Sequence, residues 1–407
     1  MTHVAPHEFS RTSNNPPGRA RLRRVDVAIV GGGLSGSVLA TVLGRAGIRV
    51  AVVDLHAVHP PEFKAEKLAG DQLELLRRLR LFDRLTANAT PVHETLCARH
   101  GKPIDRQRKT EYGLLYQDMV AAARAQLPAA AELVIGRVAD VSAGSETQTV
   151  TLGDGGAIEA RLLVVATGGG GAMRQKLGIE RRVIRDAHSL SLGFDVEPAP
   201  GARFPFQALA YYGERVADGV DYVSLFPIGR VMRANLFCFR DVRDPWARAF
   251  VDRPRDMLLE TMPGIARFLG EFRIPGKAQA RVVDLVEVAG HRRDGVVLVG
   301  DAFRTTCPAT GTGISKLLTD IECLSRHVPH WLATPGMAAG KIAQFYGDPA
   351  KVACDAQALS WSEYRRSITI DPSLGWEVHR RRVYLGRRVR GWLDRLASAP
   401  DPAPSAA

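Results

Sequence analysis

Apolar residues near the start of the chain form a pattern that predicts a strand, a tight turn and a helix. The run Val25–Val30 is apolar except for Asp26, which is typical of a buried strand. The glycine-rich stretch Gly31–Gly36 follows, and a helical pattern then continues to about Ala46. A second apolar strand, Arg49–Asp54, ends on a carboxylate. This order predicts the opening β-α-β unit of a parallel sheet.

The glycine-rich turn has the chemistry of a dinucleotide site. It spells G-x-G-x-x-G between a strand and a helix, so its backbone can approach a pyrophosphate at the helix start. The acid that ends the second strand can bond a ribose hydroxyl, and it disfavours a 2′-phosphate. This pattern alone leaves FAD and NAD both open. The candidate cofactor residues of this region are Gly31, Gly33, Leu34, Ser35, Gly36 and Asp54.

A second strand-turn-helix pattern lies far along the chain. The β-branched run Val296–Val299 predicts a buried strand that leads into Gly300-Asp301. Pro308 and Gly311-Thr312-Gly313 follow, after which apolar residues recur at helical spacing. A carboxylate at a strand end accepts hydrogen bonds from hydroxyls, and a helix N-terminus favours negative charge. The combination suits a sugar-linked cofactor that becomes anionic, as a reduced flavin with its ribityl chain does.

These residues carry a resemblance to a known family. Gly300-Asp301-Ala302, Pro308 and Gly311-Thr312-Gly313 together resemble the second flavin motif of FAD-dependent monooxygenases of the para-hydroxybenzoate hydroxylase type. Some of the motif is also similar to squalene epoxidases. The resemblance implies that Asp301 holds the ribityl or pyrophosphate part of FAD, and that the amides of Gly311–Gly313 lie near the pyrimidine edge of the flavin. With this motif, the cofactor we expect is non-covalent FAD.

Two further positions, one before a predicted helix and one within another, can be compared with the arginines that the same family carries there. The family usually places an arginine before the helix predicted at Gln72–Leu81. Lys64 is the candidate for that contact with the FAD phosphates, with Lys67 or a merely solvated basic turn as alternatives. Tyr116, in a helix predicted over Glu111–Leu127, stands where related sequences often carry an arginine, and its contact stays unassigned.

A third segment departs from the family pattern. The apolar strand Leu162–Ala166 leads into Thr167, where hydroxylases of the family carry an aspartate near both FAD and NADPH. Gly171 also replaces the usual serine, while Arg174 is retained. A threonine can donate or accept a hydrogen bond but carries no charge. The departure leaves the fold inference intact and weakens the expectation of normal NADPH-driven reduction.

Alternating apolar and polar residues between Val183 and about Arg281 predict strands at Leu190–Val196, Ala208–Tyr212, Asp221–Phe226 and Val231–Arg240. The resemblance implies that they form the sheet that covers the substrate over the flavin. The candidate pocket residues are His188, Tyr211, Tyr212, Tyr222, Phe226, Arg233 and Asn235.

The expected fold is α/β, with a Rossmann-type FAD-binding domain, an inserted substrate-covering β-sheet and a helical C-terminus. The expected division of the chain is a disordered N-terminus at 1–24, a discontinuous FAD-binding domain at 25–182 and 282–330, a substrate domain at 183–281, C-terminal helices at 331–396 and a loose tail at 397–407.

The function that the resemblance implies is monooxygenation. NAD(P)H would reduce FAD, and O₂ would then supply an oxygen atom that hydroxylates or epoxidises a small, apolar or aromatic organic substrate. One alternative is a related flavin reductase or dehydrogenase that inserts no oxygen. An alternative of another class is a basic flavoprotein that acts as a module bound to a membrane surface or to nucleic acid, although no nucleic-acid motif supports it.

Charge and cysteine content set the remaining expectations. The net charge is +12 and the pI about 9.8, so acidic surfaces should attract the protein non-specifically. The five cysteines are odd in number and form no C-x-x-C pair, which indicates neither a disulfide framework nor a metal site and fits a cytoplasmic protein. They are Cys97, Cys238, Cys307, Cys323 and Cys354.

The C-terminal region has a basic amphipathic pattern. His379–Arg395 holds seven arginines against one acid, interleaved with apolar residues. We expect a helix docked on the FAD-binding domain with a solvated arginine face. Peripheral contact of the same helix with an anionic membrane is the alternative.

Overall fold

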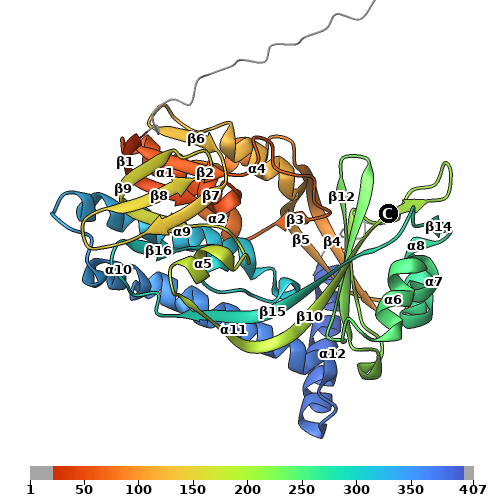
Figure 1. The fold of residues 1–407 in the computed structure, drawn as a ribbon. Helices are drawn as coiled ribbons and strands as arrows, with labels where there is room; N and C mark the ends of the chain where they lie inside the picture. Colours follow the sequence, from red (N-terminus) through yellow and green to blue (C-terminus); the bar gives the residue numbers. More distant parts are fainter. Residues whose placement is uncertain (1–21, 398–407) are drawn as a thin grey trace, which may run out of the picture.

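Two β-sheets and a set of C-terminal helices make up the molecule (Figure 1). The structure, a computed structural model, describes residues 22–397. Residues 22–24, expected in a disordered N-terminus, instead begin strand β1 (Leu22–Val30), where Leu22 pairs with Ala157 of a neighbouring strand. Residues 1–21 and 398–407 of the expected loose ends lie outside the described residues. The expected α/β fold is confirmed.

The first sheet is the core of the dinucleotide-type unit. It has seven strands in the order β6-β2-β1-β9-β8-β7, with β16 paired to β9. The strands β6, β2, β1, β9 and β16 are parallel. Val27, Val52, Leu163 and Val297 are fully buried, as expected for parallel strands covered on both faces. The further bounds are β2 Val50–Asp54, β6 Ala131–Ile135, β7 Val138–Ser142, β8 Gln148–Leu152, β9 Ala157–Val165 and β16 Val296–Leu298.

The parallel strands bring distant residues to one edge. Val30 is in register with Val165, and Val165 with Leu298, so β1, β9 and β16 end side by side. The glycine turn, the Thr167 segment and the Gly300-Asp301 turn therefore start from the same edge of the sheet. Helix α1 (Leu34–Arg45) packs behind this edge against α4 (Tyr116–Arg124) and α9 (Thr312–Leu332).

The second sheet has nine strands in the order β14-β10-β13-β12-β11-β4-β5-β3, with β15 paired to β10. Three of them come from residues 65–115, which the sequence analysis placed with the FAD-binding part. They join this sheet because β4 pairs in parallel with β11, for example Thr95 with Ala208. The bounds are β3 Ala65–Leu68, β4 Thr90–Arg99, β5 Lys102–Leu115, β10 Glu180–Pro198, β11 Ala208–Tyr212, β12 Val220–Ile228, β13 Val231–Cys238, β14 Phe272–Arg273 and β15 Gln279–Ala289.

Helices cover one face of the second sheet, where the sequence pattern had predicted only strands. They are α6 (Pro245–Asp252), α7 (Pro254–Thr261) and α8 (Ala266–Leu269). The start of α6 nevertheless has a local sequence signal for a helix. The Asp244 carboxylate caps it by accepting a hydrogen bond of 2.9 Å from the Trp246 amide, and a proline stands at the first helical position. The helix predicted over 111–127 is also shorter than expected, because β5 continues to Leu115 before α4 begins.

Alternation along the strands separates the two faces of this sheet. Leu190, Leu192 and Phe194 of β10 are buried in the core formed with α6–α8. Because successive side chains point to opposite faces, the intervening residues Ser191 and Gly193 face the other way, toward the first sheet.

The C-terminal helices connect the two sheets (Figure 1). They are α9, α10 (Ala339–Tyr346), α11 (Pro349–Ile370) and α12 (Leu374–Ala397). Helix α11 packs on α9 and reaches β12 through an ion pair between Arg365 and Asp221. Helix α12 docks on β5, where Arg387 pairs with Asp105 at 2.7 Å. β5 lies within residues 25–182, the part of the chain expected to bind FAD, although it pairs into the second sheet. Over residues 22–397, no helix has the length and apolarity needed to span a bilayer.

The short elements are α2 (Asp71–Arg78), α3 (Phe82–Leu85) and α5 (Ala172–Lys176), with 3₁₀ turns at Val216–Asp218, Pro263–Ile265, Gly300–Ala302 and Pro308–Thr310. The predicted helix at 72–81 is α2. The last two 3₁₀ turns lie at the edge where the candidate residues meet.

Candidate functional site

The glycine turn after β1 is shaped by close backbone packing at two positions and by open space at a third. Gly31 has φ +106°, and a Cβ there would lie 2.5 Å from the carbonyl oxygen of Ala166. A Cβ at Gly36 would lie 1.9 Å from the carbonyl oxygen of Gly31. At Gly33 the nearest atom to a Cβ would be the Tyr116 hydroxyl, at 3.8 Å. Two glycines thus hold the turn closed, and the third leaves room for a ligand at the start of α1.

Asp54, at the end of β2, braces this turn. Its Oδ2 accepts a hydrogen bond of 2.7 Å from the Gly32 amide, and its Oδ1 accepts one of 2.9 Å from the His56 amide. Arg124 of α4 lies 3.2 Å from Oδ1 and donates from Nε to the Gly32 carbonyl oxygen at 2.9 Å. Arg124 is not among the residues identified from the sequence, because only the packing of α4 against α1 brings it to the turn.

The Gly300-Asp301 turn follows β16 at the same edge. Gly300 has φ +60°, and a Cβ there would lie 2.9 Å from Oγ of Ser35 in α1. The two candidate motifs are therefore in contact. Asp301 is half-buried, and within the described chain its carboxylate accepts no hydrogen bond. A carboxylate held at a strand end with open acceptor sites suits hydroxyls of a ligand.

A buried ion network that the sequence analysis missed supports this turn. Asp320 accepts from the Gly300 amide at 2.8 Å, and Lys316 donates to the Gly300 carbonyl oxygen at 3.1 Å. Lys351 lies 2.6 Å from Asp320 and 3.1 Å from Asp355. Burial alone would raise the pKa of Asp320, but the two lysines hold it below its ordinary value. Two cations and two carboxylates are thus buried away from water beneath the turn.

Lys64 rather than Lys67 faces the candidate cofactor residues. Its Nζ lies 3.7 Å from the ring centroid of Tyr116 and 3.5 Å from the Glu66 carboxylate. Burial opposes the charge of Lys64, yet Glu66, Tyr116 and Asp301 together keep its pKa above the ordinary value. Lys67 is engaged elsewhere, because it pairs with Glu111 at 2.7 Å.

The turn from Pro308 to Gly313 begins α9. Gly311 has φ +68°, which favours glycine, and its carbonyl oxygen accepts a hydrogen bond of 2.8 Å from Gln72. The Thr312 amide is occupied by the Thr310 hydroxyl at 3.3 Å. A Cβ at Gly313 would meet no atom closer than Thr306 Oγ1, at 3.8 Å. Of the two helix-start amides, that of Gly313 is therefore the more available to a ligand.

Thr167 and Arg174 lie where the third segment enters the same edge. The Thr167 hydroxyl is buried and has no hydrogen-bond partner in the described chain. Arg174 donates to the carbonyl oxygens of Ala302 and Gly169, at 3.1 and 3.0 Å. Arg174 thereby ties the Thr167 segment to the Gly300-Asp301 turn, and it is a structural link rather than a free cation.

The strand faces divide the candidate pocket residues. Tyr222 faces the first sheet and donates to the Ala309 carbonyl oxygen at 3.0 Å. Phe226 and Arg233 are paired across β12 and β13 and share that face. Tyr211 does not, because it lies in the core with α6–α8, where its hydroxyl bonds Glu214 and accepts from the Gly101 amide at 2.9 Å. Tyr212 and Asn235 follow the same alternation onto the face of Tyr222 and Arg233.

Arg233 is the polar centre of that face. Its Nε donates to Asp195 at 2.6 Å, and its guanidinium carbon lies 3.6 Å from the ring centroid of Phe63. Its Nη1 is buried and has no partner among the described residues, and the same holds for the Ser191 hydroxyl. Phe63 comes from the segment just before Lys64, so Arg233 lies where the two parts of the molecule meet. Arg233 and Ser191 thus offer unused hydrogen-bond donors beside the ring of Phe63.

His188 lies at the end of this face nearest α11. It is fully buried, and neither ring nitrogen makes a hydrogen bond with a described residue. Burial lowers the pKa of His188 to about 4, so the ring is neutral near pH 7. Its ring packs edge-on against Phe239 with centroids 5.4 Å apart.

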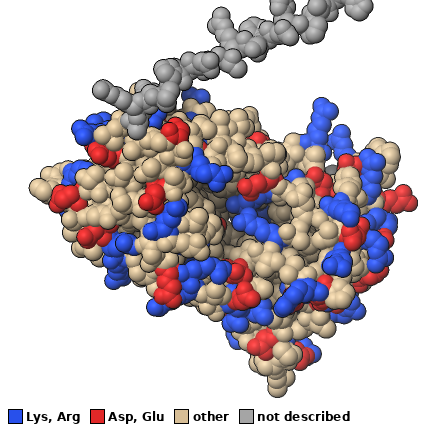
Figure 2. Space-filling view, viewed as in Figure 1, with Lys and Arg blue, Asp and Glu red and all other residues tan. Residues whose placement is uncertain are grey.

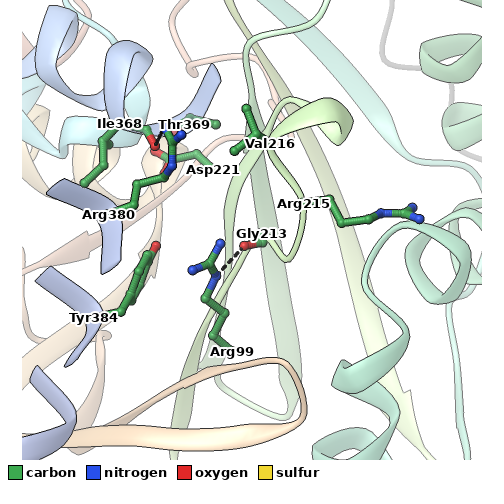
Figure 3. Close-up of a pocket in the computed structure, with 9 residues that line it drawn as sticks. All are labelled: Arg99, Gly213, Arg215, Val216, Asp221, Ile368, Thr369, Arg380 and Tyr384. Carbon is green, nitrogen blue, oxygen red and sulfur yellow. Dashed lines mark hydrogen bonds between the residues drawn. The ribbon is translucent and has the colours of Figure 1, made fainter. Parts of the chain in front are cut away.

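The surface is hollowed between the two sheets, with Lys and Arg side chains at the hollow (Figure 2). A separate pocket lies between the end of β11 and helices α11 and α12 (Figure 3). There, Arg99 donates to the Gly213 carbonyl oxygen at 2.8 Å, beside Arg380 and Tyr384. Its volume is about 10 Å³, which is room for one water molecule, so it is no substrate site.

Comparison with known proteins agrees with this geometry. Residues 24–329 match the family model described as FAD binding domain. The chain belongs to the FAD-binding monooxygenase family. It is 30% identical over 356 residues to the ubiquinone hydroxylase UbiL of Rhodospirillum rubrum, an alignment that covers 81% of this chain and 76% of UbiL. This confirms the resemblance found in the sequence, and the protein is an FAD-dependent oxidoreductase.

Two other relatives extend the comparison. The squalene monooxygenase of Rattus norvegicus is 26% identical over 376 residues, which are 86% of this chain but only 63% of that protein's length. The crystal structure of p-nitrophenol 4-monooxygenase PnpA from Pseudomonas putida DLL-E4 superposes with a TM-score of 0.72 at 18% identity, covering 91% of this chain and 94% of PnpA. The PnpA match bears on the fold alone.

The residues at the sheet edge fit the FAD-binding domain that the family model describes. Open space at Gly33, an uncommitted carboxylate on Asp301 and an available amide on Gly313 lie along one edge. These groups match a pyrophosphate, hydroxyls and an anionic ring edge, in that order.

Proposed function

We propose that this monooxygenase-family protein binds FAD non-covalently and uses NAD(P)H and O₂ to hydroxylate or epoxidise a small apolar or aromatic substrate. The observation that carries the proposal is the meeting of Ser35 with Gly300 at the edge of the first sheet, opposite the uncommitted donors of Arg233. The edge of the first sheet offers the groups that hold FAD, and the face of the second sheet that carries Arg233 offers side chains that contact a substrate.

The proposed roles of the chain's own groups follow from their chemistry. Asp54 accepts a hydroxyl of the adenosine ribose, and the amides around Gly33, Leu34 and Ser35 receive the pyrophosphate. Lys64 adds a positive charge near the phosphates. Asp301 accepts hydroxyls of the ribityl chain.

The start of α9 supplies the remaining contact. The Gly313 amide and the aligned dipole of α9 stabilise negative charge on the pyrimidine edge of the flavin. Bound FAD supplies hydride acceptance from the nicotinamide and the activation of O₂. The protein's part is to position the substrate and to exclude water.

The proposed substrate is an organic ring or chain with at least one polar group. Tyr222, Phe226 and Phe63 provide aromatic surface, and Arg233 and Ser191 provide donors for a carbonyl or hydroxyl oxygen. The relatives UbiL and squalene monooxygenase carry the names of apolar compounds, which supports an apolar substrate here.

Thr167 favours a second candidate function. It is an uncharged residue at the position where hydroxylases of this type carry an aspartate, and its hydroxyl is buried without a partner. A flavin reductase or dehydrogenase that inserts no oxygen would not require the charged side chain that the hydroxylases carry at this position.

One experiment separates the two functions. The purified protein, loaded with FAD, is supplied with NADH or NADPH, labelled O₂ and a panel of quinone, phenol and isoprenoid compounds, and products are analysed by mass spectrometry. Monooxygenation predicts one labelled oxygen atom in a product for each nicotinamide oxidised. Substrate-dependent nicotinamide oxidation with no label in any product would favour the reductase and contradict the proposal.

A further inference from the structure

A stripe of apolar side chains on α12 faces away from the rest of the chain. Its members recur at intervals of three, four or seven residues, which places them on one helix face because a turn takes 3.6 residues. Helix α12 lies at the edge of the molecule, and one of its ends projects beyond the neighbouring elements (Figure 1). The exposed fractions are 74% for Leu374, 56% for Val378, 63% for Leu385, 49% for Val389 and 53% for Trp392.

The opposite face of α12 is the one that holds the helix in place. Arg387 pairs with Asp105 of β5 at 2.7 Å, and Gly391 packs so closely that a Cβ there would lie 2.7 Å from the Ile104 carbonyl oxygen. Arg380 is buried and donates to the Asp371 carbonyl oxygen at 2.8 Å. The apolar stripe is therefore not needed to dock the helix, and its exposure calls for another partner.

Arginines border the stripe. Arg382 and Arg388 lie on its two sides, and Arg390 lies further round the helix. All three are exposed, and none pairs with a carboxylate of the described residues. Arg381 is exposed as well, but it pairs with Glu377 one turn earlier. A helix with an apolar face and flanking unpaired arginines has the properties of helices that lie in a membrane interface.

We propose that α12 is the docking surface for an anionic phospholipid bilayer. The helix lies along the plane of the membrane, with Leu385 and Val389 inserted below the headgroups and the arginines at the lipid phosphates. Trp392 sits at the depth that tryptophan prefers in membrane proteins. The contact is peripheral, which agrees with the lack of a spanning helix over residues 22–397.

Charge decides against a second copy of the chain as the occupant. Two stripes packed face to face would bring Arg382 and Arg388 of both copies together. Glu377 is the one carboxylate among the described side chains of α12, and Arg381 already holds it. Like charges facing each other oppose such pairing, whereas phosphates of an anionic membrane complement the same arginines.

Vesicle sedimentation with the purified full chain tests the proposal. The wild type should sediment with phosphatidylserine-containing vesicles at low salt, much less with neutral phosphatidylcholine vesicles, and less with either when salt is raised. Two triple variants, Leu385→Ser/Val389→Ser/Trp392→Ser and Arg382→Gln/Arg388→Gln/Arg390→Gln, should each weaken the partition by at least about tenfold.

Matched controls remove similar side chains elsewhere. Val58→Ser/Ile135→Ser/Val242→Ser deletes three exposed apolar groups, and Arg137→Gln/Arg203→Gln/Arg253→Gln deletes three exposed arginines. Both controls should sediment like the wild type. Flavin content and circular dichroism of every variant verify that the fold is kept.

Three results would overturn the proposal. The first is a wild type that does not sediment, or that sediments equally with neutral vesicles at low and high salt. The second is an α12 variant that partitions like its control. The third is a wild type that does not bind vesicles but is a dimer by light scattering, while the variant with three serines in the stripe is a monomer. That result would make a second copy of the chain the occupant.

Discussion

The carboxylate of Asp320 accepts a hydrogen bond of 2.8 Å from the backbone amide of Gly300. Asp320 lies on α9 and Gly300 follows β16, so this bond fixes the Gly300-Asp301 turn to the helix whose start lies beside it. The same carboxylate faces Lys351 at 2.6 Å with almost no exposure of either side chain. The turn is thus held by a buried carboxylate whose charge is neutralised by the buried Lys351.

Removing the charge of Asp320 should destabilise the protein. Asp320→Asn leaves Lys316 and Lys351 with Asp355 as their remaining carboxylate partner, and breaking a buried pair costs about 3–5 kcal/mol. Glu322→Gln on the same helix is the control, since its pair with Arg78 is half exposed and should matter by at most about 1 kcal/mol. Urea unfolding measures both. Equal stability of the two variants would contradict a role for the network.

Asp301→Ala should lower FAD occupancy. Loss of a buried acceptor for hydroxyls should cost about 1–3 kcal/mol of binding free energy. The measurement is FAD released by acid per mole of protein, after dialysis, with the exposed Asp83→Ala as control. If Asp301→Ala keeps the wild-type flavin content, Asp301 does not contact the cofactor.

Gly313→Pro should make the flavin harder to reduce. Proline removes the amide that we assign to the pyrimidine edge, and the lost stabilisation of about 0.3–2 kcal/mol lowers the midpoint potential, about 30 mV for each 1.4 kcal/mol. Gly313→Ala keeps the amide, and its Cβ would make only an ordinary contact of 3.8 Å with Thr306 Oγ1, so it should keep the potential. Spectroelectrochemical titration of FAD-loaded protein decides, and identical potentials for both variants would show that this amide does not act on the flavin.

Cys307→Ser should leave the flavin releasable and the rate of its reduction within about a few-fold of the wild type. Burial raises the pKa of the Cys307 thiol to about 11, so it stays protonated at neutral pH and is a poor nucleophile. Denaturing gels of the wild type should therefore show no flavin fluorescence on the protein band. A fluorescent band that disappears in the variant would reveal a covalent link instead.

His188 should make stability depend on pH. Its pKa is about 4 in the folded chain against 6.5 when free, so the unfolded chain binds the proton more readily. The stability from the neutral ring is present above about pH 6.5 and declines as pH falls toward 4, by about 2 kcal/mol between pH 7 and pH 5. Urea unfolding at these two pH values should show a smaller decline for His188→Asn than for the exposed control His330→Asn. Equal declines would mean that His188 titrates normally.

The sequence by itself determined the two glycine-containing strand-turn-helix motifs and the type of fold. Glycine spacing between a strand and a helix is a local constraint, since only glycine fits the φ of Gly31 and the contact at Gly36. Apolar runs likewise predicted the parallel strands, because burial on both faces leaves no polar alternation. These features lie within short stretches of chain, and their resemblance to known motifs indicated the family that the comparisons confirm.

Tertiary structure decided which side chains share a surface. Alternation along β11 separates two adjacent tyrosines. Only the packing of α6–α8 shows that Tyr211 lies in the core, while Tyr212 on the other face contacts Tyr384 of α12. Residues 65–115 join the second sheet through pairing with β11, a contact across more than one hundred residues that local patterns do not encode.

The charged groups inside the molecule also depend on long-range contacts. Arg124 reaches Asp54 across the α1–α4 packing, and Lys351 reaches Asp320 from α11. In the sequence, Arg124, Asp320 and Lys351 look like ordinary solvated helix positions. Their burial and pairing arise only when helices that are far apart along the chain close over the same edge of the sheet.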